Sequence, residues 1–539
     1  MNPANASILT AAQMRAVDSA TIHDEPIASI DLMERAALAC VDWLLAHMPS
    51  NTRYHVFCGL GNNGGDGLAI TRLLCARGQT AHAYLIDHSA ADALMSAMSS
   101  DAAINWQRLQ TLANQQNAYT ERILERIRHI ADLPEPCAFT ERDCLIDALL
   151  GTGTTRAAEG LLAQVIERLN AYSLNKYAAS QLVAIDLPSG LLSDAHTPAD
   201  WPVIHATHTL TFECAKPALL WPENAERVGD WQILPIGLSQ QAIAAQHSTM
   251  QWVTREWAHA QRTARGKFAH KGTFGHALLI AGAHGTIGAA ILAARACLRS
   301  GVGLLTVHSP NCGYTSLQTA APEAMVHTDV NERVWSEAVH VASYDAIGIG
   351  CGIGQSAETR HALRAFLHRL AQQSKPAQPL VLDADALNIM ASEPDLLALL
   401  PPNSILTPHP KEFERLVAHL HWDTSSNALR QQVQLMFAQR YGVIIVLKGA
   451  HTCTALPDGR SFYNTTGNPG MAKGGSGDAL TGVILAHLAQ GYAPDVAAIL
   501  SVYLHGAAGD RAAEQFGQTA MLPSDLIESL GIELPSSRT

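Results

Sequence analysis

Short runs of apolar residues alternate with longer amphipathic segments along most of the chain. Each run is rich in β-branched residues and leads through a glycine-containing turn into a helical pattern. This alternation predicts βα units, in which parallel strands form a sheet with helices packed on its faces, so both halves of the chain are predicted to be α/β. Examples of these runs are residues 55–58, 144–147, 182–186, 277–280, 380–383 and 443–447.

Several of the predicted strands end on or beside an acidic residue. Asp147, Asp186 and Asp383 close three of them. Ligands bind outside the carboxyl ends of the strands in open α/β sheets, so these carboxylates are predicted to lie near binding sites.

The strand pattern is lost between residues 238 and 266, where Gln, Ala and Arg predominate. We therefore place a domain boundary near residue 245, which predicts one domain over 1–245 and a second over 246–539. Residues 102–130 are predicted to form one or two helices with a polar face.

Length and composition agree with two globular domains. A chain of 539 residues exceeds the size of about 250–300 residues at which a single hydrophobic core stops growing. Apolar residues make up 47% of the chain and charged residues 16%, which excludes a disordered protein. The net charge of -12 argues against binding to a nucleic-acid backbone, because that binding needs clustered Lys and Arg.

The sequence indicates a cytoplasmic protein. The N-terminus lacks a basic region followed by an apolar stretch, and the ten cysteines include no C-x-x-C pair, which fits a reducing compartment. The most apolar long window, 276–298, is interrupted by Gly282, His284, Gly285 and Arg295, so it predicts a strand, a turn and a helix and not a membrane span. We expect small-molecule substrates, a homo-oligomer, and no nucleic-acid or membrane partner.

A glycine-rich segment, 59–67, follows the first predicted strand and leads into a helix. Its residues Gly59, Gly61 and Gly64 satisfy G-x-G-x-x-G, and Asp87 stands roughly where a ribose-binding acid would follow. That pattern alone is also compatible with a tight turn that binds nothing. The additional Asn pair, Gly pair and Asp provide polar groups that a turn does not require.

The longer string resembles the signature of the NAD(P)H-hydrate epimerase family, the YjeF N-terminal domain, and the agreement spans residues 9–240. The resemblance implies a Rossmann-like three-layer α/β/α fold. Further segments that fit the family are 32–36 on the first helix, 147–153, Arg156, Gly160, 184–191, 211–212 and Lys216.

The resemblance also implies roles for individual residues. Asp186 would contact the hydrated nicotinamide as acid/base, although it could instead only cap the following turn. Potassium would be bound by Asn63, Asp147 and Ser189, whose oxygen atoms suit a hard cation. The segment 193–196 departs from the family pattern, because it lacks a glycine expected after its Asp. The dinucleotide would contact Asn62, Asn63, Gly64, Gly65, Asp66, Gly151, Thr152, Gly153, Thr154, Thr155, Arg156, Ala157 and Asp186.

A second glycine-rich segment, 474–478, reads Gly-Gly-Ser-Gly-Asp. Small residues at a helix start leave N–H groups free for an anion, and the helix dipole favours negative charge there. Asp478 would stand beside the bound phosphate, where repulsion makes a carboxylate costly unless it has a task such as activating a hydroxyl. The alternative is a glycine-rich helix start without chemistry. No G-x-x-x-x-G-K-[ST] occurs, which excludes a P-loop enzyme.

This segment resembles the anion hole and base of the ribokinase-like superfamily, and the accompanying motifs resemble its NAD(P)H-hydrate dehydratase branch over 260–530. Cys351 stands where the family pattern leads us to expect proline. The motifs that carry the likeness include 270–272, 282–290, 301–304, 322–325, 350–354, 382–388, 406–413 and 447–452.

The dehydratase resemblance implies a second set of roles. Asp478 would be the catalytic base, and Mg²⁺ would accompany ADP. Asp383 and Asp385 could hold that magnesium through water or could only cap a helix. The hydrated dinucleotide would contact Ala290, Gly352, His409 and Asp478, with His409 otherwise a structural histidine. The nucleotide would contact Lys448, Gly449, Ala450, His451, Thr452 and Gly477.

Together the two resemblances imply a bifunctional enzyme that repairs hydrated NADH and NADPH. The N-terminal domain would interconvert the R and S hydrates, and the C-terminal domain would dehydrate the S form with ADP. One alternative makes the C-terminal domain a kinase for a vitamin precursor. Another makes the N-terminal domain a non-catalytic nucleotide-binding module, as in decapping-associated scaffold proteins of the same fold.

Overall fold

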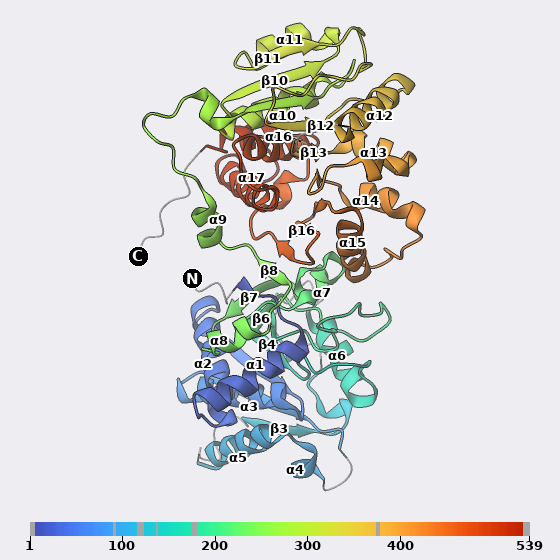
Figure 1. Ribbon diagram of the computed structural model, residues 1–539. Coiled ribbons are helices and arrows are strands. Elements are labelled where there is room, and N and C mark those ends of the chain that lie inside the picture. The colour runs from blue at the N-terminus through green and yellow to red at the C-terminus, as the bar shows by residue number, and fades with distance from the viewer. Residues whose placement is uncertain are drawn as a thin grey trace. The chain divides into compact units, whose positions relative to one another are not determined.

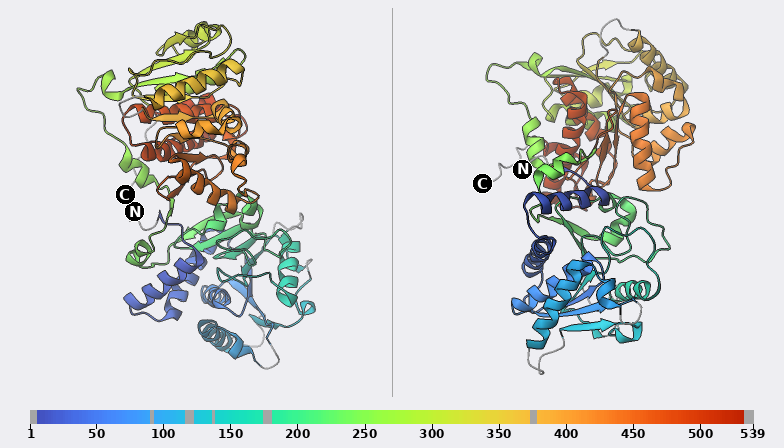
Figure 2. Two further views of the ribbon diagram at one scale, coloured as in Figure 1. Left: turned by 45° about the vertical axis from the view of Figure 1, so that its right-hand side comes forward. Right: turned by 60° about the horizontal axis from the view of Figure 1, so that its bottom comes forward.

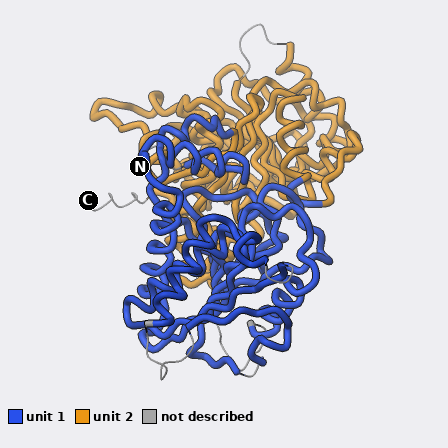
Figure 3. The backbone as a smooth tube through the Cα atoms, turned by 90° about the horizontal axis from the view of Figure 1, so that it is seen from below, with its two compact units in different colours: residues 1–248, 426–428 blue, residues 249–425, 429–539 orange. Residues whose placement is uncertain are grey.

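The computed structural model describes residues 6–89, 93–115, 123–135, 138–173, 181–372 and 378–531. The chain divides into two compact units, one of residues 1–248 with 426–428 and one of residues 249–425 with 429–539 (Figure 3). Each unit has its own sheet, so each is described by itself. The first long segment ends at Ser248, close to the predicted boundary at residue 245.

The first unit is built on seven parallel strands in the order β3-β2-β1-β4-β5-β6-β7 (Figure 1). Strands β2 and β3 follow β1 on one side, and β4 to β7 lie on the other. The strand order therefore reverses between β1 and β4, which is where doubly wound sheets bind ligands. The strands are β1 Arg53–Cys58, β2 Thr80–Ile86, β3 Leu124–Ile127, β4 Asp143–Ala148, β5 Gln181–Ile185, β6 His208–Phe212 and β7 Asp230–Leu234.

Helices pack on both faces of this sheet because the strands are apolar on both faces. In β1, Val56 and Cys58 enter the core formed with α2, α3 and α5, whereas Phe57 enters the core formed with α6. This confirms the expected Rossmann-like three-layer architecture. The helices are α1 Ala11–Asp24, α2 Ser29–His47, α3 Asn62–Ala76, α4 Leu94–Ala97, α5 Ser100–Gln115, α6 Gly160–Ser173, α7 Ala225–Val228 and α8 Gln240–Ala245.

The second unit has a ten-stranded sheet in the order β11-β10-β9-β12-β13-β14-β15-β16-β17-β8. Strands β9 to β15 run parallel, and β16 lies antiparallel to both β15 and β17. Its strand order reverses between β9 and β12. The strands are β8 Met250–Trp252, β9 His276–Ile280, β10 Leu304–Ser309, β11 Met325–Thr328, β12 Ala346–Ile349, β13 Leu380–Leu382, β14 Ile405–Leu406, β15 Ile444–Leu447, β16 Cys453–Ala455 and β17 Ser461–Tyr463.

Two cores flank the second sheet as well. One contains residues of α10, α16 and α17, and the other contains residues of α12, α13, α14 and α15. The ribbon views show helices on both faces of this sheet (Figure 2). This is the expected ribokinase-like α/β/α layering. The helices are α9 Arg255–Gln261, α10 Ile287–Arg299, α11 Tyr314–Ala320, α12 Ala357–Ala371, α13 Ala384–Ser392, α14 Pro410–Val417, α15 Asn427–Tyr441, α16 Ser476–Ala489, α17 Pro494–Phe516 and α18 Pro523–Glu528.

Two details differ from the sequence-based expectations. The segment 102–130 contains most of α5, as expected, but also the edge strand β3. Residues 32–36 lie on α2, the second helix and not the first. The apolar window 276–298 does form a strand, a turn and a helix, β9 and α10. Within the described parts of the chain, no helix is both long enough and apolar enough to cross a bilayer.

Candidate active sites

The glycine loop of the first unit follows β1 at the point where the strand order reverses. A Cβ atom on Gly59 would lie 2.0 Å from the carbonyl oxygen of Leu149, and one on Gly64 would lie 1.8 Å from that of Gly59. These two glycines are therefore required by close backbone packing. Gly61 has nothing within 4 Å of its Cβ position, so it faces open space at the start of α3.

A cavity of about 330 Å³ opens beside the start of α3. Of the residues predicted to contact the dinucleotide, four line it: Asn62, Asp66, Thr152 and Asp186. Gly64 and Gly65 are buried beneath it. The remaining predicted contacts do not line this cavity. Asn63 lies in the first turn of α3, and the others belong to the loop after β4: Gly151, Gly153, Thr154, Thr155, Arg156 and Ala157.

Asp186 lies in this cavity directly after β5, with a backbone φ of +66°. The ammonium group of Lys216, which is 1% exposed, donates to Asp186 Oδ1 at 2.7 Å and to Thr211 Oγ1 at 2.8 Å. The carboxylate therefore faces a buried cation, and none of its hydrogen bonds to described residues caps the turn that follows. The sequence contained Lys216 as a family fragment but no pattern that gave it this role.

The three predicted potassium ligands lie close together beside the loop that follows β4. Ser189 donates from Oγ to Asp147 Oδ1 at 2.6 Å and from its backbone N–H to Asp147 Oδ2 at 2.8 Å. Burial raises the pKa of Asp147 to about 6, although these hydrogen bonds oppose the shift. The side-chain oxygen of Asn63 is buried and has no hydrogen-bond partner. A buried carboxylate and a free amide oxygen fit a cation bound by oxygen atoms.

The described residues contain no cluster of three or more His, Cys, Asp or Glu side chains that could hold a metal. Asp87, which the sequence suggested as a ribose contact, is engaged elsewhere. Its carboxylate accepts from Ser89, Arg126 and Arg128, and these bonds lower its pKa although burial opposes them.

In the second unit the predicted phosphate loop leads into α16, a helix of 14 residues. Gly475 is its N-cap with a φ of +101°, a conformation that glycine adopts without strain. Asp478 lies in the first turn of the helix. The free N–H groups and the carboxylate are thus both at the N-terminal end of α16.

A cavity of about 690 Å³ adjoins this helix start. Among the predicted contacts, His409, Lys448, Gly449, Ala450, Thr452 and Gly477 line it. Ala290, Gly352, His451 and Asp478 do not line it, and the ring of His451 packs against Trp252, with centroids 5.3 Å apart. Functional candidates that the sequence did not single out also line the cavity: Asn464, Thr466, Gly467, Asn468, Lys473 and His505. Most of these lie in the glycine-rich stretch that leads to α16.

Asp478 is half-buried close to a second carboxylate. Burial raises its pKa to about 6 and the charge of Asp383 adds to the shift, whereas Cys351 and Lys448 oppose it. Cys351, at the position where proline was expected, is fully buried. These surroundings give Asp478 the affinity for a proton that a general base near neutral pH requires.

Lys448 and the carboxylates around it form a buried network. Its ammonium group donates to Asp383 Oδ1 at 2.9 Å, and Thr481 Oγ1 donates to Asp383 Oδ2 at 2.9 Å. Lys448 also lies 3.9 Å from Glu412, whose other oxygen is 3.4 Å from Nε2 of His409. Burial lowers the pKa of Lys448, but the charges of Asp383 and Glu412 outweigh it and raise the pKa. Asp383 makes no side-chain cap on α13, although it precedes that helix.

His409 has both of the alternative roles available to it. Its Nδ1 accepts from the backbone N–H of Glu412 at 3.4 Å, which caps α14, while its side chain is 45% exposed in the cavity. His505, from α17, lies within hydrogen-bonding distance of the Ser476 carbonyl, 3.0 Å from its Nε2. Burial lowers the pKa of His505 to about 4, so this histidine is neutral and fixes the loop without adding charge.

The loops after β9 and β12 meet where the second strand order reverses. Thr286 Oγ1 donates to the Gly352 carbonyl at 2.7 Å, which joins the two loops. Ala290 is fully buried in the first turn of α10 and does not line the large cavity. Asp385 accepts from the backbone N–H of Gly354 at 2.9 Å and so holds the second loop.

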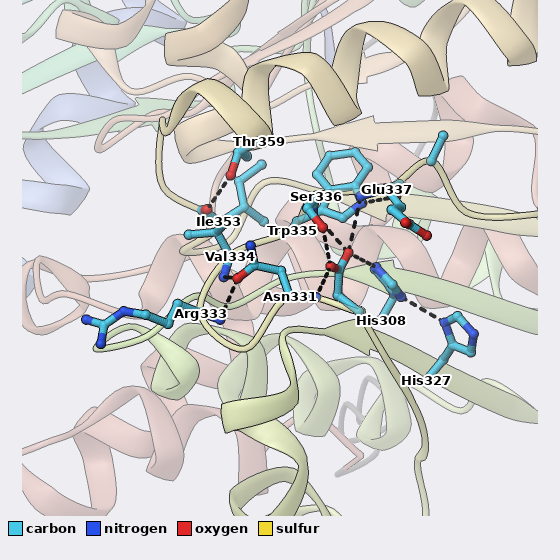
Figure 4. Close-up of polar contacts among 12 residues, drawn as sticks. His308, His327, Asn331, Arg333, Val334, Trp335, Ser336, Glu337, Ile353 and Thr359 are labelled. Atoms are coloured by element: carbon cyan, nitrogen blue, oxygen red, sulfur yellow. Dashed lines mark hydrogen bonds and ion pairs between the residues drawn. The ribbon is translucent and has the colours of Figure 1, made fainter.

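A neighbouring loop, residues 329–337, is held by one buried carboxylate (Figure 4). Asp329 accepts from the backbone N–H groups of Asn331 and Ser336 at 2.8 and 3.0 Å, and it lies 3.2 Å from Nε2 of His308. In the same loop, the carbonyl of Arg333 accepts a hydrogen bond from the backbone N–H of His284 at 2.8 Å. It therefore supports the loop after β9, which carries His284.

The fold and these sites define the class of protein. A Rossmann-like unit with a glycine-rich loop after β1 is joined to a ribokinase-like unit in which a glycine-rich helix start carries a carboxylate, Asp478, in its first turn.

Comparisons with known proteins agree with that class. A family model described as NAD(P)H-hydrate dehydratase matches residues 277–531, and one described as YjeF-related protein N-terminus matches residues 29–218. The bifunctional NAD(P)H-hydrate repair enzyme of Moorella thermoacetica is 36% identical, over 97% of this chain and 96% of its own length. That of Escherichia coli is 34% identical, over 93% and 88%. The chain belongs to the bifunctional NAD(P)H-hydrate repair enzymes.

Among solved structures, the ADP/ATP-dependent NAD(P)H-hydrate dehydratase of Bacillus subtilis, co-crystallized with ATP and Mg²⁺, is 33% identical. The match covers 51% of this chain and 95% of that protein, with a TM-score of 0.44.

Proposed function

We propose that this chain repairs NADH and NADPH whose nicotinamide ring has taken up water. The first unit interconverts the R and S hydrates, and the second converts the S hydrate to NAD(P)H with ADP, releasing AMP and phosphate. The observation that carries the proposal is the presence of two separate sites in one member of this family. One is the cavity at the dinucleotide loop around Asp186, and the other is the anion site beside Asp478.

The dehydration begins with transfer of a phosphoryl group. Asp478 takes the proton of the C6 hydroxyl group while that oxygen attacks the terminal phosphorus of ADP. The N–H groups at the start of α16 and the ammonium of Lys448 offset the negative charge that develops on the phosphoryl oxygens. Phosphate is a far better leaving group than hydroxide, so its elimination restores the dihydronicotinamide ring.

The residues present fit both metal ions that the family resemblance implies. Magnesium supplied with ADP neutralises phosphate charge when bound. Asp383 already accepts from Lys448 and Thr481, so it would reach that ion through water and not as a direct ligand. Potassium bound at Asn63, Asp147 and Ser189 offsets the charge of the dinucleotide phosphates, and the unpartnered oxygen of Asn63 supports that assignment.

In the first unit, Asp186 acts as acid/base on the hydrated ring. Lys216 keeps this carboxylate oriented, because the ammonium group is itself buried and bonded to Thr211 and to the Phe212 carbonyl. The ring would occupy the 330 Å³ cavity, with the dinucleotide phosphates toward the start of α3, where N–H groups and the helix dipole favour anions.

Incubation with mixed NADH hydrates and ADP tests the proposal. Absorbance of the restored dihydronicotinamide is followed to its end point. Complete conversion is expected, because both epimers become accessible to the dehydratase. Conversion of only half would remove the epimerase assignment, and no conversion would overturn the dehydratase assignment.

The cytoplasmic location and the homo-oligomeric state expected from the sequence also belong to this proposal. Cell fractionation tests the first, and light scattering of the purified protein tests the second.

A further inference from the structure

Helix α1 carries an acidic side chain, Asp18, into the cavity of the first unit. The helix is fixed at its start in two ways. Thr10 and Gln13 form a capping box, and Asp194 accepts from the N–H of Ala11 at 2.9 Å. Asp194 belongs to the segment 193–196 that departs from the family pattern, so this loop helps to hold the helix that carries Asp18.

The carboxyl groups that line the cavity differ in their hydrogen-bond partners. Asp186 is bonded to Lys216, and Asp101 accepts from Ser29. Asp18 has no hydrogen-bond partner among the described residues. The other charged groups in the cavity lining are Arg15, on the same helix as Asp18, and Asp66, on α3.

Asp18 and Asp186 have different surroundings within this cavity. Burial raises the pKa of Asp18 to about 6, where the charge of Lys216 opposes the shift and that of Asp186 adds to it. Asp186 has a cation 2.7 Å away, whereas Asp18 forms no ion pair with any residue that the structure describes. Two carboxyl groups that line one cavity, only one of them paired with a buried cation, suit the separate roles of an acid and a base.

We propose that Asp18 is the second catalytic carboxyl group of the epimerase site, donating a proton to the departing oxygen while Asp186 receives one from the incoming water. The inference rests on the proposed epimerase function, and it assigns the partner of Asp186 in that reaction.

The chemistry balances as two half-steps at C6, which is bonded to the ring nitrogen. In the first, protonated Asp18 gives its proton to the C6 hydroxyl oxygen, the C–O bond breaks, and water leaves with the bonding pair while the nitrogen lone pair forms a C=N bond. In the second, water adds to C6 from the opposite face, the C=N pair returns to nitrogen, and Asp186 takes the proton. The opposite epimer reacts with the two roles exchanged.

The acidic character of the cavity fits this route. Loss of water places a positive charge on the ring, and the carboxylate of Asp186 would stabilise it. Asp66 would contribute less charge, because burial and the charges of Asp186 and Asp18 raise its pKa well above its usual value. The unreacted ring is neutral, so the attraction is stronger in the transition state than in the bound substrate. Only such a difference accelerates the reaction.

The test uses the full chain with Asp18→Asn and, as the matched control, Asp24→Asn. Both residues lie on α1 and both changes remove one negative charge, but Asp24 is exposed and does not line the cavity. Interconversion of the separated epimers is measured by chromatography without ADP. Asp18→Asn is expected to slow it about 10² to 10⁴ fold, the usual scale for a positioned proton donor, while Asp24→Asn leaves it unchanged.

Two further measurements distinguish a proton donor from a structural residue. Asp18 must be protonated to act, so kcat/KM for epimerisation should fall as pH rises through about 6. This fall of kcat/KM with rising pH should be absent in Asp18→Asn. Asp18→Glu should retain it, together with part of the rate. In water labelled with ¹⁸O, each change of configuration should place one label at C6, and retention of the original oxygen would overturn the route.

Dehydration of the pure S epimer with ADP serves as the internal control, because Asp18 lies outside the cavity of the second unit. If the unaltered chain does not interconvert the epimers, the proposed epimerase function fails. If it does so and Asp18→Asn is as fast, only the role of Asp18 fails.

Discussion

Burial shifts the pKa of Asp147 and of Asp478 in the same direction, but the groups around the two residues differ. Burial raises the pKa of each to about 6. Asp147 accepts hydrogen bonds from Ser189 and has an unpartnered Asn63 oxygen nearby, a setting that suits a cation. Asp478 has the carboxylate of Asp383 as its neighbour and lies at the start of α16. These surroundings suit a group that accepts a proton from a hydroxyl group.

Replacing Asp478 with Asn should lower the rate of dehydration by about 10² to 10⁴ fold, because the amide cannot accept the hydroxyl proton. ADP should still bind, since the amide keeps the shape of the side chain and removes a repulsive charge. Turnover is followed by absorbance, and binding by calorimetry. Unchanged turnover would remove Asp478 from its assigned role.

The pH dependence of the unaltered chain gives an independent check on the same residue. A base must be ionised, so kcat/KM for dehydration should fall as pH is lowered through about 6. The same limb should be missing from the residual activity of Asp478→Asn.

Residue identity could be predicted from the sequence where a motif surrounds it, as for Asn63, Asp147 and Asp478. Their roles remain predictions, although the structure places them as the motifs require. Asp18 and Lys216 could not be assigned in this way. Asp18 is one acid on a helix without a motif, and only the folded chain, in which α1 packs against α8, places it in a cavity with Asp186.

At the scale of secondary structure, the βα pattern predicted six strands of the two sheets, β1, β4, β5, β9, β13 and β15, whose residues are mostly buried. It failed at β3, Leu124–Ile127, because an edge strand pairs on one side only and therefore carries polar residues. It also did not predict the antiparallel strands β16 and β17, which are three residues each and too short for a period to be visible.

The turn from β1 into α3 should tolerate a methyl group at one glycine and not at another. A Cβ on Gly64 would lie 1.8 Å from a backbone oxygen, whereas a Cβ on Gly61, whose φ is -87°, would meet nothing within 4 Å. We expect Gly64→Ala to lower the free energy of unfolding by about 2 kcal/mol or more, and Gly61→Ala to change it by about 0.5 kcal/mol or less.

Thermal unfolding of the two alanine variants measures this difference with the same added atoms. Equal melting temperatures would show that the backbone can move apart at Gly64 without cost.

At the scale of the whole molecule, each unit contains a complete cavity and its own reversal of strand order. The hydrated dinucleotide must therefore leave one site and enter the other. Nothing in this scheme requires the two sites to belong to the same chain.

Two inactivated chains should complement each other when mixed. Asp186→Asn alone should convert about half of a mixed hydrate, and Asp478→Asn alone should convert none. A mixture of the two should reach complete conversion, because the epimers diffuse between chains. The measurement is the end point of absorbance, with the double variant plus unaltered chain as the control. An end point of one half for the mixture would indicate that the substrate passes only within one chain.

At residue 186 the proposed chemistry and the stability of the fold favour different residues, because the backbone of Asp186 has a φ of +66°. Left-handed conformations cost most residues roughly 1–2 kcal/mol, and glycine far less. An engineer who selected this unit for heat resistance alone would therefore be led toward glycine at residue 186 and would lose the carboxylate by the same step. Thermostable variants should accordingly be screened for epimer interconversion, and not for NADH restored from the S epimer, which the dehydratase would still convert after that loss.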